Sequence, residues 1–236
     1  MNLKESFEYL ILRDIQALSF NDQMLYLQQH FNSICFSTSF SYEDQVITHM
    51  LKDFKDVAFF TLDTGRLFEQ TYDTWNLTIA KYGLKITSYF PESTSVEEFV
   101  NTNGPDSFYK SVELRKECCF IRKVLPLKRA LDQKQIWITG LRAEHSINRQ
   151  NMSPFEWDEQ NQIIKFHPLL LWTTQQVISF VEENQIPYNP LHKQGYISIG
   201  CSPCTRAIKP TEDFRAGRWW WEDASKKECG LHLKTE

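Results

Sequence analysis

Short apolar runs and helix-spaced apolar positions alternate along this chain. Five runs of four to seven residues predict buried strands, and they lie at residues 33–37, 57–62, 84–90, 135–139 and 163–166. Strands this short and this apolar are typical of a sheet that is covered on both faces. The intervening segments must then supply the helices that cover it.

Helix-spaced apolar positions between these runs predict helices at residues 10–18, 23–31, 44–52, 67–82 and 115–132. We expect Gly83 to cap the fourth of these helices and Pro126 to interrupt the fifth. Two Ser/Thr-x-x-Glu/Gln pairs predict capping boxes that open further helices, at Ser95 with Glu98 and at Thr173 with Gln176. Alternating strands and helices predict an α/β fold with a mostly parallel sheet and helices on both faces.

The pattern changes after about residue 185, where prolines and tryptophans replace the periodic segments. We expect residues 1–185 to form the ligand-binding α/β domain. Residues 186–236 form an irregular C-terminal arm on it, and the two make one integrated unit.

The composition of the chain excludes several classes of protein. The chain has 236 residues, 42% of them hydrophobic, and a net charge of −4. There is enough apolar surface for a folded core, and no apolar run is long enough to cross a membrane. The charged N-terminal segment does not resemble a signal peptide, so we expect a cytoplasmic protein with reduced cysteines. The mild acidity argues against a nucleic-acid partner, and a homo-oligomer remains open.

Polar residues follow three of the predicted strands, where parallel sheets bind their ligands. They are Ser37 and Ser39, then Asp63, Thr64 and Gly65, then Arg142. Each group has an ordinary structural explanation, namely a helix N-cap, an Asx turn and a solvated arginine. Together they favour an anionic nucleotide at this edge of the sheet.

Four cysteines occur in two pairs, the adjacent Cys118 and Cys119 and the C-x-x-C of Cys201 and Cys204. Four thiolates suit zinc or an iron–sulfur cluster, and the adjacent pair favours iron–sulfur because neighbouring sulfurs fit one zinc ion poorly. The C-x-x-C alone would also suit a redox dithiol. Lys123 follows one helical turn after the first pair and would favour an anionic group there.

Two further groups lie near the C-terminus. Cys229 has Lys226, Lys227 and His232 close in sequence, which would lower its thiol pKa, although an exposed unreactive thiol is the simpler alternative. Arg215 and Arg218 flank a glycine beside three tryptophans, a pattern that suits a phosphate or sulfate clamp. The tryptophans would otherwise only pack the arm onto the core. We expect Cys35, inside the first strand, to be a buried unreactive thiol.

Seven short motifs follow one another in an order that resembles the assimilatory sulfonucleotide reductases, specifically the adenylyl-sulfate (APS) reductase type. They are SxSFxxED at 37–44, LDTGR at 62–66, CCxxRK at 118–123, TGLR at 139–142, CxxC at 201–204, RAGRWWW at 215–221 and KECGLH at 227–232. The resemblance covers most of the chain. One departure is Ser41, where relatives often have glycine.

The resemblance implies an adenine-nucleotide hydrolase-like α/β fold and thioredoxin-dependent reduction of APS to sulfite and AMP. It implies Cys229 as the nucleophile, an S-sulfonate on that thiol, and thioredoxin or glutaredoxin as the electron donor. It also implies a [4Fe-4S] cluster, held by Cys118, Cys119, Cys201 and Cys204. The substrate-binding residues that we expect are Ser37, Ser39, Asp63, Thr64, Gly65, Lys123, Arg142, Arg215, Arg218 and His232.

Three alternatives remain at this stage. The substrate could be 3′-phosphorylated PAPS, which would need further cationic contacts. The protein could be an ATP-dependent sulfur-transfer pyrophosphatase, although that class carries a glycine-rich S-G-G-x-D-S turn where this chain has SFSYED. It could also be a zinc-binding interaction module without enzymatic activity.

Overall fold

A six-stranded sheet forms the centre of the computed structural model, which describes residues 2–12, 15–145 and 151–223. The strands are β1 (Ile34–Ser37), β2 (Val57–Leu62), β3 (Ile86–Tyr89), β4 (Ile136–Ile138), β5 (Phe155–Asp158) and β6 (Ile163–Phe166). Their order in the sheet is β3-β2-β1-β4-β6-β5. Neighbouring strands are parallel except β5, which pairs antiparallel with β6. The expected α/β fold with a mostly parallel sheet is confirmed.

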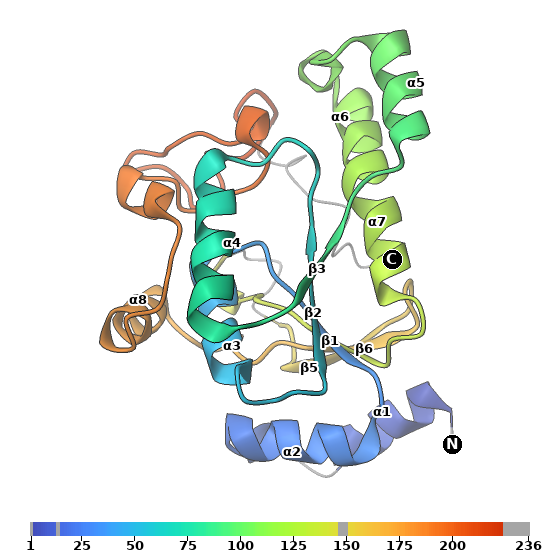
Figure 1. The fold of residues 1–236 in the computed structure, drawn as a ribbon, viewed down its shortest axis with the longest axis vertical. Helices are drawn as coiled ribbons and strands as arrows, with labels where there is room; N and C mark the ends of the chain where they lie inside the picture. The colour runs from blue at the N-terminus through green and yellow to red at the C-terminus, as the bar shows by residue number, and fades with distance from the viewer. Residues whose placement is uncertain (1, 13–14, 146–150, 224–236) are drawn as a thin grey trace.

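Helices cover both faces of this sheet (Figure 1). They are α1 (Leu3–Leu12), α2 (Phe20–His30), α3 (Tyr42–Leu51), α4 (Glu69–Tyr82), α5 (Ser93–Asn103), α6 (Val112–Cys119), α7 (Leu125–Leu131) and α8 (Thr174–Glu183). Helices α3, α4 and α8 lie on one side and α5, α6 and α7 on the other. The core strands are consequently buried on both faces, and Phe36, Ile138 and Phe166 have no exposed surface.

Several details of the predicted elements are confirmed. Gly83 caps α4 in the left-handed conformation, with φ of 65°. Thr173 and Gln176 form both hydrogen bonds of a capping box at the start of α8. Cys35 is fully buried, and this burial raises the pKa of its thiol to about 12.

Other predicted boundaries were wrong. The first helix begins at Leu3 and ends at Leu12, not at residues 10–18, because side chains of its earlier turn already pack on the core. The capping box at Ser95 does not form, since α5 begins two residues earlier, at Ser93. Strand β5 was not predicted at all.

The helix predicted at residues 115–132 is divided into three parts. Helix α6 passes into a π-helical segment, η3 (Phe120–Val124), and then into α7. Pro126 lies in the first turn of α7, where its missing N–H is tolerated. The segment that carries the adjacent cysteines is thus continuous with α7 although it contains a proline.

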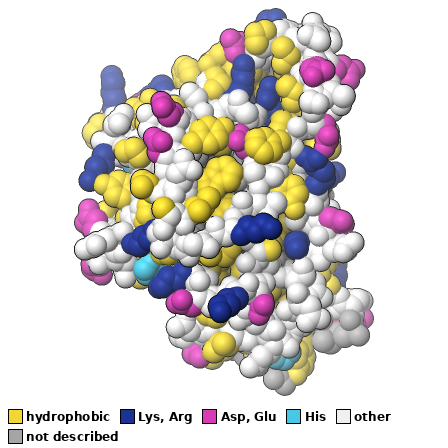
Figure 2. Space-filling view, viewed as in Figure 1, with side chains coloured by type: hydrophobic (Ala, Val, Ile, Leu, Met, Phe, Trp, Pro, Cys, Tyr) yellow, Lys and Arg dark blue, Asp and Glu magenta, His cyan; other side chains and the backbone are white. Residues whose placement is uncertain are grey.

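Within the described residues no helix is both long and apolar enough to span a membrane. Lysine, arginine and acidic side chains are interspersed on the face shown in Figure 2, around a band of hydrophobic side chains. A mixed surface of this kind agrees with the small net charge of −4.

Candidate active site

A cavity of about 270 Å³ lies where the carboxyl ends of β1, β2 and β4 meet the C-terminal arm. This is the edge of the sheet that the sequence predicted. Six of the expected substrate-binding residues line it, namely Ser37, Ser39, Thr64, Lys123, Arg215 and Arg218. The strand ends, the π-helical segment and the C-terminal arm therefore line one cavity, although Ser37 and Arg218 are 181 residues apart in sequence.

The turn after β1 forms one wall of this cavity. Its Ser39 donates both its backbone N–H and its hydroxyl to the Oδ2 atom of Asp44, over 2.6 and 2.7 Å. Ser37 accepts a hydrogen bond from Nε1 of Trp137 over 2.8 Å. The hydrogen bonds that Ser37 and Ser39 form in this structure are therefore with other residues of the protein.

Ser41 causes no strain in this turn. It is the N-cap of α3, with φ of −69°, and its hydroxyl accepts a hydrogen bond from the Asp44 N–H. The positive φ of the turn, 61°, lies instead at Phe40. Glycine is thus not required at position 41, and the departure from the family pattern leaves the backbone in an ordinary conformation.

Asp63 and Gly65 do not line the cavity. The Oδ1 atom of Asp63 accepts a hydrogen bond from the Gly65 N–H over 2.8 Å, which is an Asx turn, and Tyr72 donates its hydroxyl to the same carboxylate. The structural explanation considered for these residues therefore describes their contacts here, and their expected role in substrate binding stays a prediction.

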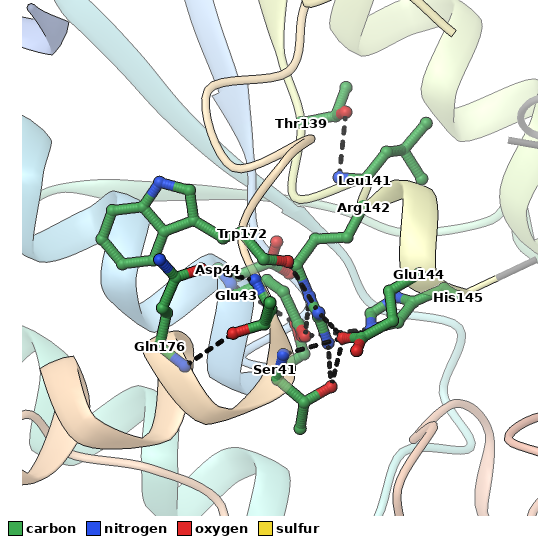
Figure 3. Close-up of polar contacts among 12 residues, drawn as sticks. Ser41, Glu43, Asp44, Thr139, Leu141, Arg142, Glu144, His145, Trp172 and Gln176 are labelled. Carbon is green, nitrogen blue, oxygen red and sulfur yellow. Dashed lines mark hydrogen bonds and ion pairs between the residues drawn. The ribbon is translucent and has the colours of Figure 1, made fainter. Parts of the chain in front are cut away.

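Arg142 does not line the cavity either, which differs from what its position after β4 suggested. It is 1% exposed, and Figure 3 shows its guanidinium enclosed by polar groups. It donates to Glu43 over 3.0 Å and to Glu144 over 2.6 Å. It also donates to the backbone oxygen of Trp172 and to the hydroxyl of Thr174, both over 3.0 Å. Arg142 thus cross-links α3, the loop after β4 and α8, and a further contact to Nε2 of His145 completes the partners of its five N–H groups.

Glu43 is the acidic centre of this network. Burial alone would raise the pKa of its carboxyl group. A hydrogen bond from His145 and the positive charges of His145 and Arg142 outweigh burial and lower that pKa to about 2. His145 in turn stacks on Phe214 of the arm, with ring centroids 4.1 Å apart, and both rings line the cavity. The network therefore supports one wall of the cavity from behind.

Three cations line the cavity itself, Lys123, Arg215 and Arg218. Arg218 is 8% exposed and lies over the ring of Trp219 at 4.8 Å. Its guanidinium passes so close to Gly200 that a Cβ atom there would lie 2.4 Å from it. A side chain at position 200 would therefore displace this guanidinium, a consequence that the sequence alone did not reveal.

The four paired cysteines line a second, smaller cavity next to the first. Cys201 and Cys204 are buried, Cys118 and Cys119 are half-buried, and none of the four is in a disulfide. Phe108 and Trp219 cover them. The structure thus brings the two pairs to one cavity, and their expected role as cluster ligands stays a prediction.

Lys123 and Cys201 belong to both cavities and form their shared wall. Thr64 lies at the same boundary, with its hydroxyl 3.2 Å from the Cys201 sulfur. Burial alone would raise the pKa of Cys201, but the charge of Lys123 and the Thr64 hydrogen bond outweigh burial and lower it. The thiolate form is therefore favoured at Cys201, whereas burial raises the pKa of the Cys118 thiol and raises that of Cys204 to about 12.

A buried ion pair that the sequence did not predict fixes the C-terminal arm to α6, the helix that carries Cys118 and Cys119. Arg115 of α6 donates two hydrogen bonds to the carboxylate of Glu222, over 2.8 and 2.7 Å. The two side chains are 1% and 2% exposed. Arg115 also lies over the ring of Trp219, at 4.6 Å. The sequence indicated this pair only through Arg115, a charged residue in a predicted helix that the structure shows to be buried.

The predicted nucleophile Cys229 and the predicted ligand His232 lie outside the described residues, which end at Asp223. Their assignments therefore rest on the sequence. Cys229 follows Glu222 by seven residues in the sequence, and Glu222 is an anchored side chain near the end of the described residues.

A mostly parallel α/β sheet with a cation-lined cavity at its carboxyl edge defines a class of proteins that bind anionic, nucleotide-like ligands. Residues 33–207 match the family described as Phosphoadenosine phosphosulfate reductase domain. The chain belongs to this family.

Several relatives are similar over most of their length. Adenosine 5′-phosphosulfate reductase of Allochromatium vinosum is 44% identical over 230 residues, which cover 97% of this chain and 89% of the relative. The enzyme of the same name from Agrobacterium fabrum is 46% identical over 199 residues, covering 84% and 76%.

The fold is shared with solved structures. The phosphoadenylyl-sulfate reductase of Candida auris, solved as a phosphate complex, superposes with a TM-score of 0.72 at 29% identity, covering 86% of this chain and 97% of that one. FMN adenylyltransferase of Candida glabrata, in complex with FMN and an ATP analogue, has a TM-score of 0.53 at 15% identity, covering 93% and 74%. The second likeness concerns the fold alone.

Proposed function

We propose that this protein is an oxidoreductase that reduces adenosine 5′-phosphosulfate to sulfite and AMP. The observation that carries the proposal is the guanidinium of Arg218. It is buried at the cavity, and among the described residues it contacts no carboxylate. A buried cation without a counter-ion is unfavourable, so an anionic ligand is the expected partner. The names of the relatives support a phosphosulfate as that anion.

In this proposal the cavity holds the nucleotide, and Lys123, Arg215 and Arg218 face its phosphosulfate. The thiolate of Cys229 attacks the sulfur atom, the bond between sulfur and the bridging oxygen breaks, and AMP leaves with that electron pair. The three cations stabilise the negative charge that grows on the AMP phosphate. The product on the protein is a Cys229 S-sulfonate.

A dithiol protein of the thioredoxin or glutaredoxin class then supplies two electrons. One of its thiolates attacks the Cys229 sulfur, sulfite leaves, and a mixed disulfide forms. The second thiol of the partner resolves this disulfide and restores the Cys229 thiol. A nucleophile on a C-terminal segment can meet the nucleotide first and the partner protein afterwards.

We further propose that the four paired cysteines hold a [4Fe-4S] cluster. Four cysteines that form no disulfide line one cavity together with Lys123, and such a set suits iron–sulfur ligation. Among the described residues no three or more potential ligands are placed to hold a single metal ion. A four-iron cluster takes one thiolate per iron, so its ligands lie farther apart than those around one zinc. When bound, the cluster would join α6 to the arm and add its charge beside Lys123.

Trapping of the sulfonate tests the proposal. After mixing with APS, mass spectrometry should find one SO₃ added to the peptide that contains Cys229, and reduced thioredoxin should then release sulfite. Cys229→Ser should lose the adduct and all turnover but keep nucleotide binding. Cys35→Ala, which removes a thiol buried in β1, is the matched control and should keep both. Turnover without an adduct would refute the mechanism. Equal turnover of PAPS would extend the substrate to the 3′-phosphorylated nucleotide.

A further inference from the structure

Two consecutive carboxylates at the start of α3 have opposite electrostatic surroundings. Glu43 is paired with Arg142 and His145, 3.0 and 3.3 Å away. Asp44 is 6% exposed and has no cationic partner among the described residues. Its carboxylate accepts hydrogen bonds from the N–H and the hydroxyl of Ser39 and interacts with the hydroxyl of Ser41. Neighbouring acids whose surroundings differ in this way are expected to hold their protons at different pH.

Asp44 also lines the cavity that Lys123, Arg215 and Arg218 face. Its Oδ1 atom lies against Gly140, just after β4, so closely that a Cβ atom at that position would overlap it. An anionic ligand in the cavity would therefore bring negative charge next to a buried carboxylate. Like charges at short range in a buried site disfavour the ionised form of the acid.

We infer that Asp44 takes up a proton when the sulfonucleotide binds, and that it acts as a positioning residue which keeps Ser39 in place while the ligand is bound. This inference rests on the proposed function, which supplies the ligand. Burial raises the pKa of Asp44 to about 6 in the free protein, even though the Ser39 donors oppose that rise. The geometry and the pKa thus point in the same direction. A nearby anion would raise the pKa further, so binding would be tighter at low pH.

The other ionisable groups around Asp44 define the control. Glu43 faces it from the same helix, and Arg142 and His145 face Glu43 from the loop after β4. Of these groups, Glu43 has a pKa lowered to about 2 and so stays ionised over the pH range of the experiment. His145 is the one that could also take up a proton near neutral pH, and it lines the same cavity.

The experiment measures APS binding by calorimetry in the Cys229→Ser background, which cannot react. Titrations at pH 7 in buffers of different ionisation enthalpy should give an uptake of about 0.9 proton per APS bound, since a group with a pKa near 6 is mostly ionised before binding. The Kd should increase about 50-fold from pH 6 to pH 8. Asp44→Asn, which mimics the protonated acid, should abolish both effects and bind APS at pH 8 at least as tightly as the background. His145→Gln should keep both.

Other results would overturn the inference. APS binding without proton uptake, or with a Kd independent of pH, refutes it even if the Asn variant does not fold. Uptake that survives in Asp44→Asn and disappears in His145→Gln assigns the proton to the histidine. Failure of APS to bind at all refutes the proposed function itself, so the two failures can be told apart.

Discussion

The ion pair between Arg115 and Glu222 gives the most direct test of how the arm is held. Replacing the arginine by methionine keeps the apolar stem but removes the guanidinium. The carboxylate of Glu222, 2% exposed, then loses both charged hydrogen bonds and has no water to replace them. Trp219 also loses the cation that lies 4.6 Å from its ring.

The expected cost follows from these contacts. Removing one partner of a buried ion pair typically destabilises a protein by about 3–5 kcal/mol. Two charged hydrogen bonds at roughly 1.5–3 kcal/mol each give a similar sum. We therefore expect Arg115→Met to lower the free energy of unfolding by about 3–5 kcal/mol. In a domain of this size that corresponds to a decrease in Tm of roughly 6–20 °C.

Urea unfolding monitored by tryptophan fluorescence measures this change. The matched control is Arg206→Met, which breaks an equally bidentate but exposed pair with Glu212 and should have a much smaller effect. The double variant Arg115→Met with Glu222→Leu should recover most of the loss, because no unpaired charge remains buried. A single variant that costs less than about 1 kcal/mol, or a double variant as unstable as the single one, would refute the reasoning.

Three further predictions concern the cavity walls. Gly140→Ala would place a Cβ atom 2.4 Å from the Oδ1 atom of Asp44, so we expect a loss of roughly 1–3 kcal/mol in urea unfolding, and wild-type stability would contradict the close approach. The pKa of Glu43, lowered to about 2, means that its ionised form stabilises the fold above pH 4.5. About 3 kcal/mol should be lost as the pH falls from 4.5 towards 2, and Glu43→Gln should lose that part of the acid dependence of Tm. Ser37→Ala removes the acceptor of the buried Trp137 Nε1–H and should cost about 1–3 kcal/mol, with a shift in tryptophan fluorescence that Ser37→Thr does not cause.

Much of the sheet could be predicted from the sequence because its strands carry a local signal. The run Val57–Leu62 is apolar enough to predict a strand from its own residues. The capping box of Thr173 and Gln176 is likewise a local feature, a contact within one helical turn. Strand β5 lacked this signal because Phe155–Asp158 alternates with acidic residues at the edge of the sheet. Its pairing with β6 depends on contacts made across the two strands, such as the ring of Phe155 stacked 4.4 Å from that of Phe166.

The location of the site was also predictable, since parallel strands present their ends at one edge. The direction of each side chain was not. Arg142 follows β4 as expected, but Glu43, 99 residues earlier, and Thr174, 32 residues later, draw its guanidinium away from the cavity. The ion pair between Arg115 and Glu222 depends likewise on a contact across 107 residues, which no local pattern specifies.

The anchor at Glu222 has a kinetic consequence for the proposed reaction. A thiol seven residues beyond a fixed point stays within about 25 Å of it, since a chain spans at most roughly 3.6 Å per residue. Confinement within that distance gives the thiol an effective concentration of at least the millimolar range, whatever path the intervening residues take. Cys229 would thus react with bound substrate faster than a dissolved thiol at a lower concentration. Breaking the anchor at Glu222 would lower the effective concentration of the Cys229 thiol without changing any contact to the nucleotide.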